Sequence, residues 1–387
     1  MGSGEFAYLD PIAAPVIEVC LKGTSNIEPT LVKEEKMDSE AGCEVIISSD
    51  SHVMEPSEIL VERAPQSFKD RVPRFPQLKV GSSFQTHPGG SDPSCRIQEM
   101  ETDGLSAEVL YPTYLLPHFA MDDGKLQGVS FHAYNDWLID YCKASPKRLI
   151  GIAAIAVYDI DEAVKELERC ARAGLKGSLI WQAPHPDLPL RSEHYNKFWE
   201  ASQSMNLPVH LHILTGHGYH KETVFGNKRT GPEAYRGSVN LKLAEIINAF
   251  FDLIFHGVLE RYPRLKFVSV ENEIGWMPFM LQQWDYYYNR FKKENPPPMT
   301  KNPSEYFANQ IFGTFFRDTV AGHSFEWWGQ DNCMWSNDYP HGNSTWPDSK
   351  KYIDRDLGHL SPEIRRKLVY TNVKKLYDID ISHPVLQ

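Results

Sequence analysis

Residues 333–341 read Cys-Met-Trp-Ser-Asn-Asp-Tyr-Pro-His, and the organisation of the whole chain can be worked out from this stretch. A short apolar run leads directly into Asp338, and Pro340 cannot continue a strand. The pattern predicts Asp338 at the carboxyl end of a buried β-strand, where parallel barrels hold their chemistry. The alternative is an ordinary turn in which Asp338 caps a helix. Polar residues at the ends of other strands decide between the two.

Similar apolar runs recur along the chain and alternate with segments of helical periodicity. The predicted strands are 45–49, 107–111, 149–154, 177–181, 207–214, 265–270, 310–315 and the beginning of 333–341. Eight strands alternating with helices predict an α/β fold, a single (β/α)8 TIM barrel. A doubly wound open sheet is the alternative. It is disfavoured as a dinucleotide-binding fold because no Gly-x-Gly-x-x-Gly follows the first strand.

The composition is ordinary for a globular enzyme and excludes several classes of partner. The chain has 387 residues, 41% hydrophobic and 24% charged, with a net charge of −11. Because no basic stripe appears, we expect no nucleic-acid partner. The apolar runs are too short to span a membrane, and no signal peptide precedes the first strand. The six cysteines lack Cys-x-x-Cys spacing, which indicates reduced thiols in a cytoplasmic protein.

The amino-terminal segment differs from the remainder. Residues 1–43 show no clean periodicity and include a charged linker at 34–40. We predict that 1–43 form an extension or arm and that 44–387 form the barrel. An arm of this kind can wrap a neighbouring subunit, so we expect a homo- or hetero-oligomer.

Metal-binding side-chain types occur at the ends of four predicted strands. They are Asp50 and His52 on the first strand, His210 and His212 on the fifth, Glu271 on the sixth and Asp338 on the eighth. Each pair is spaced by two residues, so strand alternation sends both members to the same side. Carboxylates and imidazoles together suit Zn, Mn or Fe. Each signal alone is weak, but four in the right order predict a metal site at the mouth of a barrel.

Four motifs resemble the amidohydrolase superfamily, in particular the amidohydrolase-2 group that includes aminocarboxymuconate-semialdehyde and γ-resorcylate decarboxylases. These motifs are residues 50–56, 207–212, 257–266 and 336–341, and the resemblance extends over about 44–377. It implies a metal-dependent amidohydrolase-like barrel whose metal ligands are Asp50, His52, His212 and Asp338. Two departures stand out. Asp50 replaces the first histidine of a common His-x-His, and Glu271 stands where the decarboxylases carry a histidine.

The substitution at Glu271 suggests a second metal. Glu271 adds a hard, anionic ligand able to bridge two ions, which favours Fe or Mn over a single Zn. We therefore expect one or two divalent metals per chain. His210 or His256 would complete a second coordination sphere. The alternatives are a hydrogen-bonded barrel-interior residue for His210 and a core histidine for His256. His341 would orient Asp338 or cap the following turn.

Three functions remain open at this point. The first is a dinuclear Fe/Mn oxygenase that uses O2 to hydroxylate a small carboxylate-bearing substrate, because a few amidohydrolase-fold proteins resembling this chain are dimetal monooxygenases. The second is a hydrolase or non-oxidative decarboxylase, and the third is a non-catalytic partner subunit. We favour the oxygenase because of Glu271. Glu271 and Asp338 are the expected catalytic groups, and Trp181 and Arg236 are expected to contact the substrate.

Overall fold

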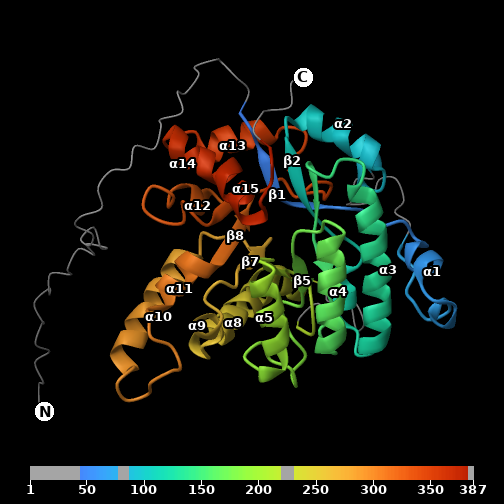
Figure 1. Cartoon of the computed structure of the whole chain (residues 1–387). Helices are drawn as coiled ribbons and strands as arrows, with labels where there is room; N and C mark the ends of the chain where they lie inside the picture. Colours follow the sequence, from blue (N-terminus) through green and yellow to red (C-terminus); the bar gives the residue numbers. More distant parts are fainter. Residues whose placement is uncertain (1–43, 77–86, 219–230, 382–387) are drawn as a thin grey trace, which may run out of the picture. The chain divides into compact units, whose positions relative to one another are not determined.

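The computed structural model describes residues 44–76, 87–218 and 231–381 (Figure 1). The predicted arm at 1–43 lies outside the described residues and stays a prediction. Within the described part, no helix combines the length and the apolar character needed to cross a membrane.

Parallel strands form the centre of the fold in two sheets, and within each sheet the strands that follow one another in the chain are paired. The strands are β1 (Ile47–His52), β2 (Ala107–Tyr111), β3 (Leu149–Gly151), β4 (Ala153–Ala154), β5 (Ser178–Ile180), β6 (Val209–His212), β7 (Phe267–Val270), β8 (Ile311–Phe315) and β9 (Cys333–Trp335). Only Ile152 separates β3 from β4, and its backbone N–H still donates to Leu110 in β2. The two short strands therefore correspond to one predicted strand, 149–154.

The chain after β9 returns to β1. The N–H of Asp338 donates to the Asp50 carbonyl at 3.0 Å, and the N–H of His52 donates to the Tyr339 carbonyl at 2.6 Å. These bonds connect the first strand with the segment that follows the last one. All eight predicted strands are present in the predicted order, and the (β/α)8 fold is confirmed.

Helices lie around the strands (Figure 1). The α-helices are α1 (Ile59–Arg63), α2 (Pro93–Asp103), α3 (Gly124–Cys142), α4 (Ile160–Arg172), α5 (Asn196–Ser204), α7 (Pro232–Arg236), α8 (Lys242–Phe255), α9 (Val258–Arg261), α10 (Met277–Phe291), α11 (Pro303–Gln310), α12 (Thr319–Gly322), α13 (Ser349–Leu357), α14 (Pro362–Arg366) and α15 (Asn372–Tyr377). In α4, Ala163, Leu167 and Cys170 are buried at helical spacing, so one apolar stripe faces the strands. The Asp159 side chain caps this helix by accepting from two backbone N–H groups.

A β-bulge interrupts β1 immediately before the predicted site. Ser48 lies opposite Glu108 of β2, whereas Ser51 lies opposite Leu110, so β1 contains one more residue than β2 over this interval. Such a bulge bends the strand and re-aims a side chain. Asp50 lies within the bulge, so its direction depends on this irregularity as well as on strand alternation.

Candidate metal centre

Five of the predicted site residues converge at the carboxyl ends of the strands. The His52 Nε2 atom lies 3.4 Å from Asp50 Oδ1, 3.5 Å from Asp338 Oδ1 and 3.3 Å from His212 Nε2. The His212 Nε2 atom lies 3.6 Å from Glu271 Oε2. These atoms form two overlapping groups of potential metal ligands that share His52 and Glu271. The first also contains Asp50 and His212, and the second also contains Asp338 and His341.

The two histidines direct a lone pair at the same point. The Nδ1 atoms of His52 and His212 lie 2.8 Å from the carbonyl oxygens of Pro112 and Ile213, respectively. Because a carbonyl only accepts, each Nδ1 carries the hydrogen and each Nε2 presents its lone pair. Burial lowers the pKa of His212 to about 3 and that of His52 well below its usual value. Two neutral rings with facing lone pairs would be stabilised by a cation bound between them.

The buried carboxylates also indicate a binding site for a cation. Both oxygens of Asp50 are buried, and neither has a hydrogen-bond partner among the described residues. Burial raises the pKa of Asp50 to about 6, and burial together with neighbouring negative charge raises the pKa of Glu271 and Asp338 well above the usual range. A buried unpaired carboxylate is costly. Two imidazoles and hard oxygen donors in this state fit a divalent transition metal.

The backbone is strained at two of these carboxylates. Glu271 has φ +57° and Asp338 has φ +54°, the left-handed region that non-glycine residues rarely adopt. The Glu271 N–H donates to Thr314 Oγ1 at 3.0 Å, and the Asp338 N–H donates to the Asp50 carbonyl. Strain of this kind persists only where the surroundings enforce it. The surrounding strands therefore hold both carboxylates toward the centre.

His341 lies beside Asp338. Its Nδ1 atom is 2.8 Å from Asp338 Oδ1, and its Nε2 atom is 3.1 Å from Thr113 Oγ1. The ring is thus held between two polar groups, in a position from which it can orient the Asp338 carboxylate.

The structure does not bring His210 or His256 to this cluster, which corrects the expectation that either supplies a second metal. Both ring nitrogens of His210 are engaged, with the Ser178 carbonyl and the Tyr377 hydroxyl, each at 2.9 Å. The ring is therefore the hydrogen-bonded interior residue considered as the alternative.

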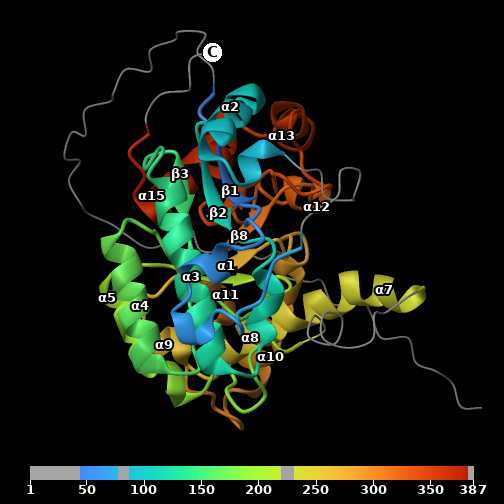
Figure 2. The ribbon, with the colours of Figure 1, turned by 90° about the vertical axis from the view of Figure 1, so that its right-hand side faces the viewer.

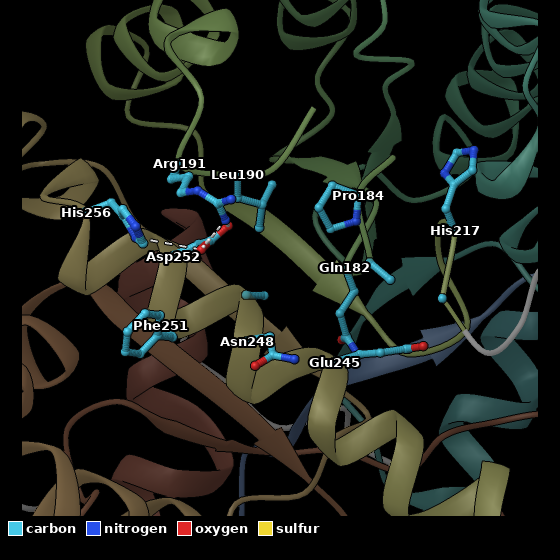
Figure 3. A pocket seen from close by; sticks show the side chains of 13 residues that line it. Gln182, Pro184, Leu190, Arg191, His217, Glu245, Asn248, Phe251, Asp252 and His256 are labelled. Atoms are coloured by element: carbon cyan, nitrogen blue, oxygen red, sulfur yellow. Dashed lines mark hydrogen bonds and ion pairs between the residues drawn. The ribbon is translucent and has the colours of Figure 1, made fainter. Parts of the chain in front are cut away.

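His256 lines a different pocket of about 470 Å³ (Figure 3). Its ring lies 3.7 Å from Asp252, which also pairs with Arg191 at 2.9 Å. Figure 3 shows these three side chains gathered at one end of the pocket. The ring is 41% exposed, so neither the metal role nor the core role expected for it applies.

Trp181 and Arg236, the two residues predicted to contact the substrate, are both engaged with other side chains of the protein. Trp181 is buried, and its Nε1 atom donates to the Tyr195 hydroxyl at 3.0 Å. Its ring packs edge-on against Tyr158. Arg236 is 57% exposed and pairs with Glu233 at 2.9 Å. Both residues belong to α7, the yellow helix labelled in Figure 2. These contacts account for both side chains without a substrate.

A further group of potential ligands, formed by Asp122, His185 and His217, is explained by hydrogen bonds. The Tyr158 hydroxyl donates to the Met121 carbonyl at 2.9 Å, so at 3.0 Å it accepts from His217 Nε2. The His217 Nε2 atom therefore carries a hydrogen, which Asp122 also approaches at 3.3 Å. We do not assign this group to a metal.

The sequence alone gave no role to Glu55, a buried carboxylate that organises the wall beside the site. It accepts from the backbone N–H groups of Thr113, Tyr114 and Leu115 at 3.0–3.1 Å. Thr113 in turn contacts His341. Its closeness in the sequence to Asp50 and His52 is the signal from which a role for Glu55 could have been predicted.

We expect Glu55→Gln to reduce stability and to change its pH dependence. Burial raises the pKa of Glu55 to about 7, above the ordinary value of 4.5 that applies in the unfolded chain. Its contribution to stability is therefore fully present below about pH 4.5 and is lost as the pH rises through about 7. Glutamine also places an amide N–H against a backbone N–H, which costs on the order of 1–3 kcal/mol.

The measurement is urea unfolding of both proteins at pH 5 and pH 8. The difference in the free energy of unfolding between the wild type and Glu55→Gln should be smaller at pH 8 than at pH 5, because only the wild type loses stability as Glu55 ionises. Glu101→Gln, which alters a surface ion pair with Arg148, is the control. An unchanged difference at the two pH values would show that Glu55 does not titrate in this range.

Comparison with known proteins agrees with the geometry. The amidohydrolase family profile matches residues 84–379, more than half of the chain. The γ-resorcylate decarboxylase of Polaromonas sp. is 24% identical over 312 residues, which cover 74% of this chain and 87% of that protein.

Solved structures share the fold. An amidohydrolase from Mycobacterium avium subsp. paratuberculosis has a TM-score of 0.69 at 19% identity, over 86% of this chain and 99% of that one. A dihydroxybenzoic acid decarboxylase from Polaromonas sp., solved with manganese and the inhibitor 2-nitroresorcinol, has a TM-score of 0.64 at 19% identity, over 88% and 98% of the two chains. The chain belongs to the amidohydrolase family, in its amidohydrolase-2 group, and is an enzyme.

Proposed function

We propose that this enzyme is a non-oxidative decarboxylase that releases CO2 from a small aromatic carboxylate. The observation that carries the proposal is the buried convergence on His52, whose Nε2 atom lies 3.3–3.5 Å from ligand atoms of Asp50, His212 and Asp338. The oxygens of both carboxylates have no hydrogen-bond partner among the described residues. The relatives that share this family are named as decarboxylases. They support the decarboxylase alternative better than the oxygenase that we favoured from the sequence.

These four residues would hold one divalent ion. The two potential ligand groups at the centre both use His52, and an imidazole Nε2 has a single lone pair that binds one metal. His210 and His256 lie outside the cluster, so among the described residues a second ion at the centre would have to share His52 or rely on His341 alone for a nitrogen donor. Manganese is our first choice because the Polaromonas decarboxylase contains it. When bound, the ion supplies a positive charge that orients and polarises substrate oxygens.

Glu271 would deliver the proton that the reaction requires. Breaking the bond to CO2 leaves an electron pair on the substrate carbon, which must take up a proton. Glu271 is 13% exposed, whereas Asp50 and Asp338 are fully buried, so Glu271 is the carboxyl group nearest to an incoming substrate. Burial and the neighbouring carboxylates raise its pKa, which favours the protonated form that a proton donor requires.

The test uses protein stripped of metal with a chelator and reloaded with Mn2+. Candidate substrates are 2,6-dihydroxybenzoate and 5-carboxyvanillate, the acids named for two solved decarboxylases of this fold. We expect release of CO2 without consumption of O2, and loss of that activity after renewed chelation. Consumption of O2 with a hydroxylated product would support the oxygenase instead. Hydrolysis of an amide or ester without CO2 release would also contradict the proposal.

A further inference from the structure

Asn337 is fully buried, and its side chain fixes the bulge that presents Asp50. Its Oδ1 atom lies 2.9 Å from Ser48 Oγ and 2.7 Å from Ser51 Oγ, the two serines that flank the bulge in β1. Ser48 Oγ also lies 3.0 Å from the Asp50 carbonyl and accepts from the Asn337 N–H at 3.0 Å. One amide therefore fastens both ends of the irregular segment that carries Asp50.

The same side chain holds the strained backbone of Asp338. The Tyr339 N–H donates to Asn337 Oδ1 at 3.2 Å, so the asparagine side chain spans the residue that lies between them. That residue is Asp338, whose φ is +54°. The Asp338 N–H reaches the Asp50 carbonyl at 3.0 Å. Two proposed metal ligands, 288 residues apart in the chain, are thus tied to Asn337 and to each other.

A buried ion pair extends these contacts to a third ligand. The Asn337 Nδ2 atom donates to Glu108 Oε1 at 3.3 Å and to Asp103 Oδ2 at 3.4 Å, which fixes the direction of the amide. Glu108 Oε2 accepts from Arg96 Nε at 2.5 Å, and Arg96 Nη1 donates to the His52 carbonyl at 2.7 Å. A continuous network therefore reaches Asp50, His52 and Asp338.

We infer that Asn337 is the positioning residue that sets the distances among the ligands contributed by β1 and by the segment after β9. The inference rests on the proposed metal site. An amide is suited to this place because its oxygen serves hydroxyl and N–H donors while its nitrogen serves two carboxylates. Aspartate would set a third carboxylate against Asp103 and Glu108, and alanine would leave buried polar groups unpaired.

The experiment compares Asn337→Ala with Asn372→Ala. Asn372 is a matched control because it is also buried and its Nδ2 atom also braces β9, donating at 2.8 Å to the carbonyls of Gln330 and Cys333 at the opposite end of that strand. Three quantities are measured on folded protein: the melting temperature, the affinity for Mn2+ and the visible spectrum after loading with Co2+. The Co2+ spectrum reports ligand geometry, which a general loss of stability does not change.

We expect Asn337→Ala to weaken Mn2+ binding by about 10–100-fold and to alter the Co2+ spectrum. Asn372→Ala should lower the melting temperature and leave both metal readouts unchanged. If Asn337→Ala does not fold, Ser51→Ala, which removes one hydroxyl partner of Asn337 Oδ1, should weaken Mn2+ binding in the same direction. Unchanged affinity in these variants, or an equal loss in Asn372→Ala, would overturn the inference. A wild-type protein that binds no Mn2+ would contradict the metal site itself.

Discussion

Replacing His212 by asparagine is expected to remove the bound metal and to reduce activity to background, whereas the same change at His210 should leave the metal in place. Asparagine at 212 keeps a donor for the Ile213 carbonyl and loses the Nε2 lone pair that faces His52. The loss of one of four ligands should exceed the 10–100-fold effect typical of groups that only support a ligand. Metal content and CO2 release are measured together.

His210→Asn is the matched control because both histidines lie on β6 and both are buried. His210 contacts Ser178 and Tyr377, so its replacement should cost stability through the lost bond to the Tyr377 hydroxyl. The predicted pattern is a lower melting temperature with one metal retained. Loss of metal in His210→Asn, or its retention in His212→Asn, would reverse the assignment of the two histidines.

Replacing Glu271 by glutamine is expected to lower the turnover rate by about 10²–10⁴-fold with the metal still bound. Glutamine has nearly the same shape but carries no transferable proton. Steady-state kinetics of CO2 release and the metal content of the same sample are the measurements. The rate should fall without a comparable rise in KM, because the lost interaction belongs to the transition state.

Glu273→Gln provides the comparison. Glu273 lies two residues further on, also has a positive φ, and its pKa is raised to about 8 by burial and by Asp318. We expect little change in turnover there. Loss of the metal in Glu271→Gln would assign Glu271 as a ligand, as we first expected from the sequence, and an unchanged rate would exclude it as the proton donor.

The sequence alone predicts the barrel and most of the candidate site. Each strand is a short apolar run, and parallel strands in chain order place their carboxyl ends together. Asp50, His52, Glu271 and Asp338 could therefore be selected as residues that end such runs. The alternation of β1 predicted that Asp50 and His52 share a side, although the structure achieves this through a bulge that no local pattern indicates.

The remaining features depend on contacts between distant parts of the chain. His210 and His212 have the same strand parity, and only the approach of Tyr377 from α15 shows that the first is fully hydrogen-bonded. The role of Asn337 likewise becomes visible only when Ser48, 289 residues away, lies within 2.9 Å of its side chain. Glu108 is a charged residue within a buried strand, a local hint that its partner is also buried.

The most direct test of the proposed metal centre is elemental analysis of the purified protein after loading with Mn2+ and dialysis. The two potential ligand groups at the centre share His52, so we predict about one divalent metal per chain. Two metals per chain would contradict the mononuclear centre and would favour the dinuclear oxygenase over the decarboxylase. No retained metal would contradict the assignment of Asp50, His52, His212 and Asp338 as ligands.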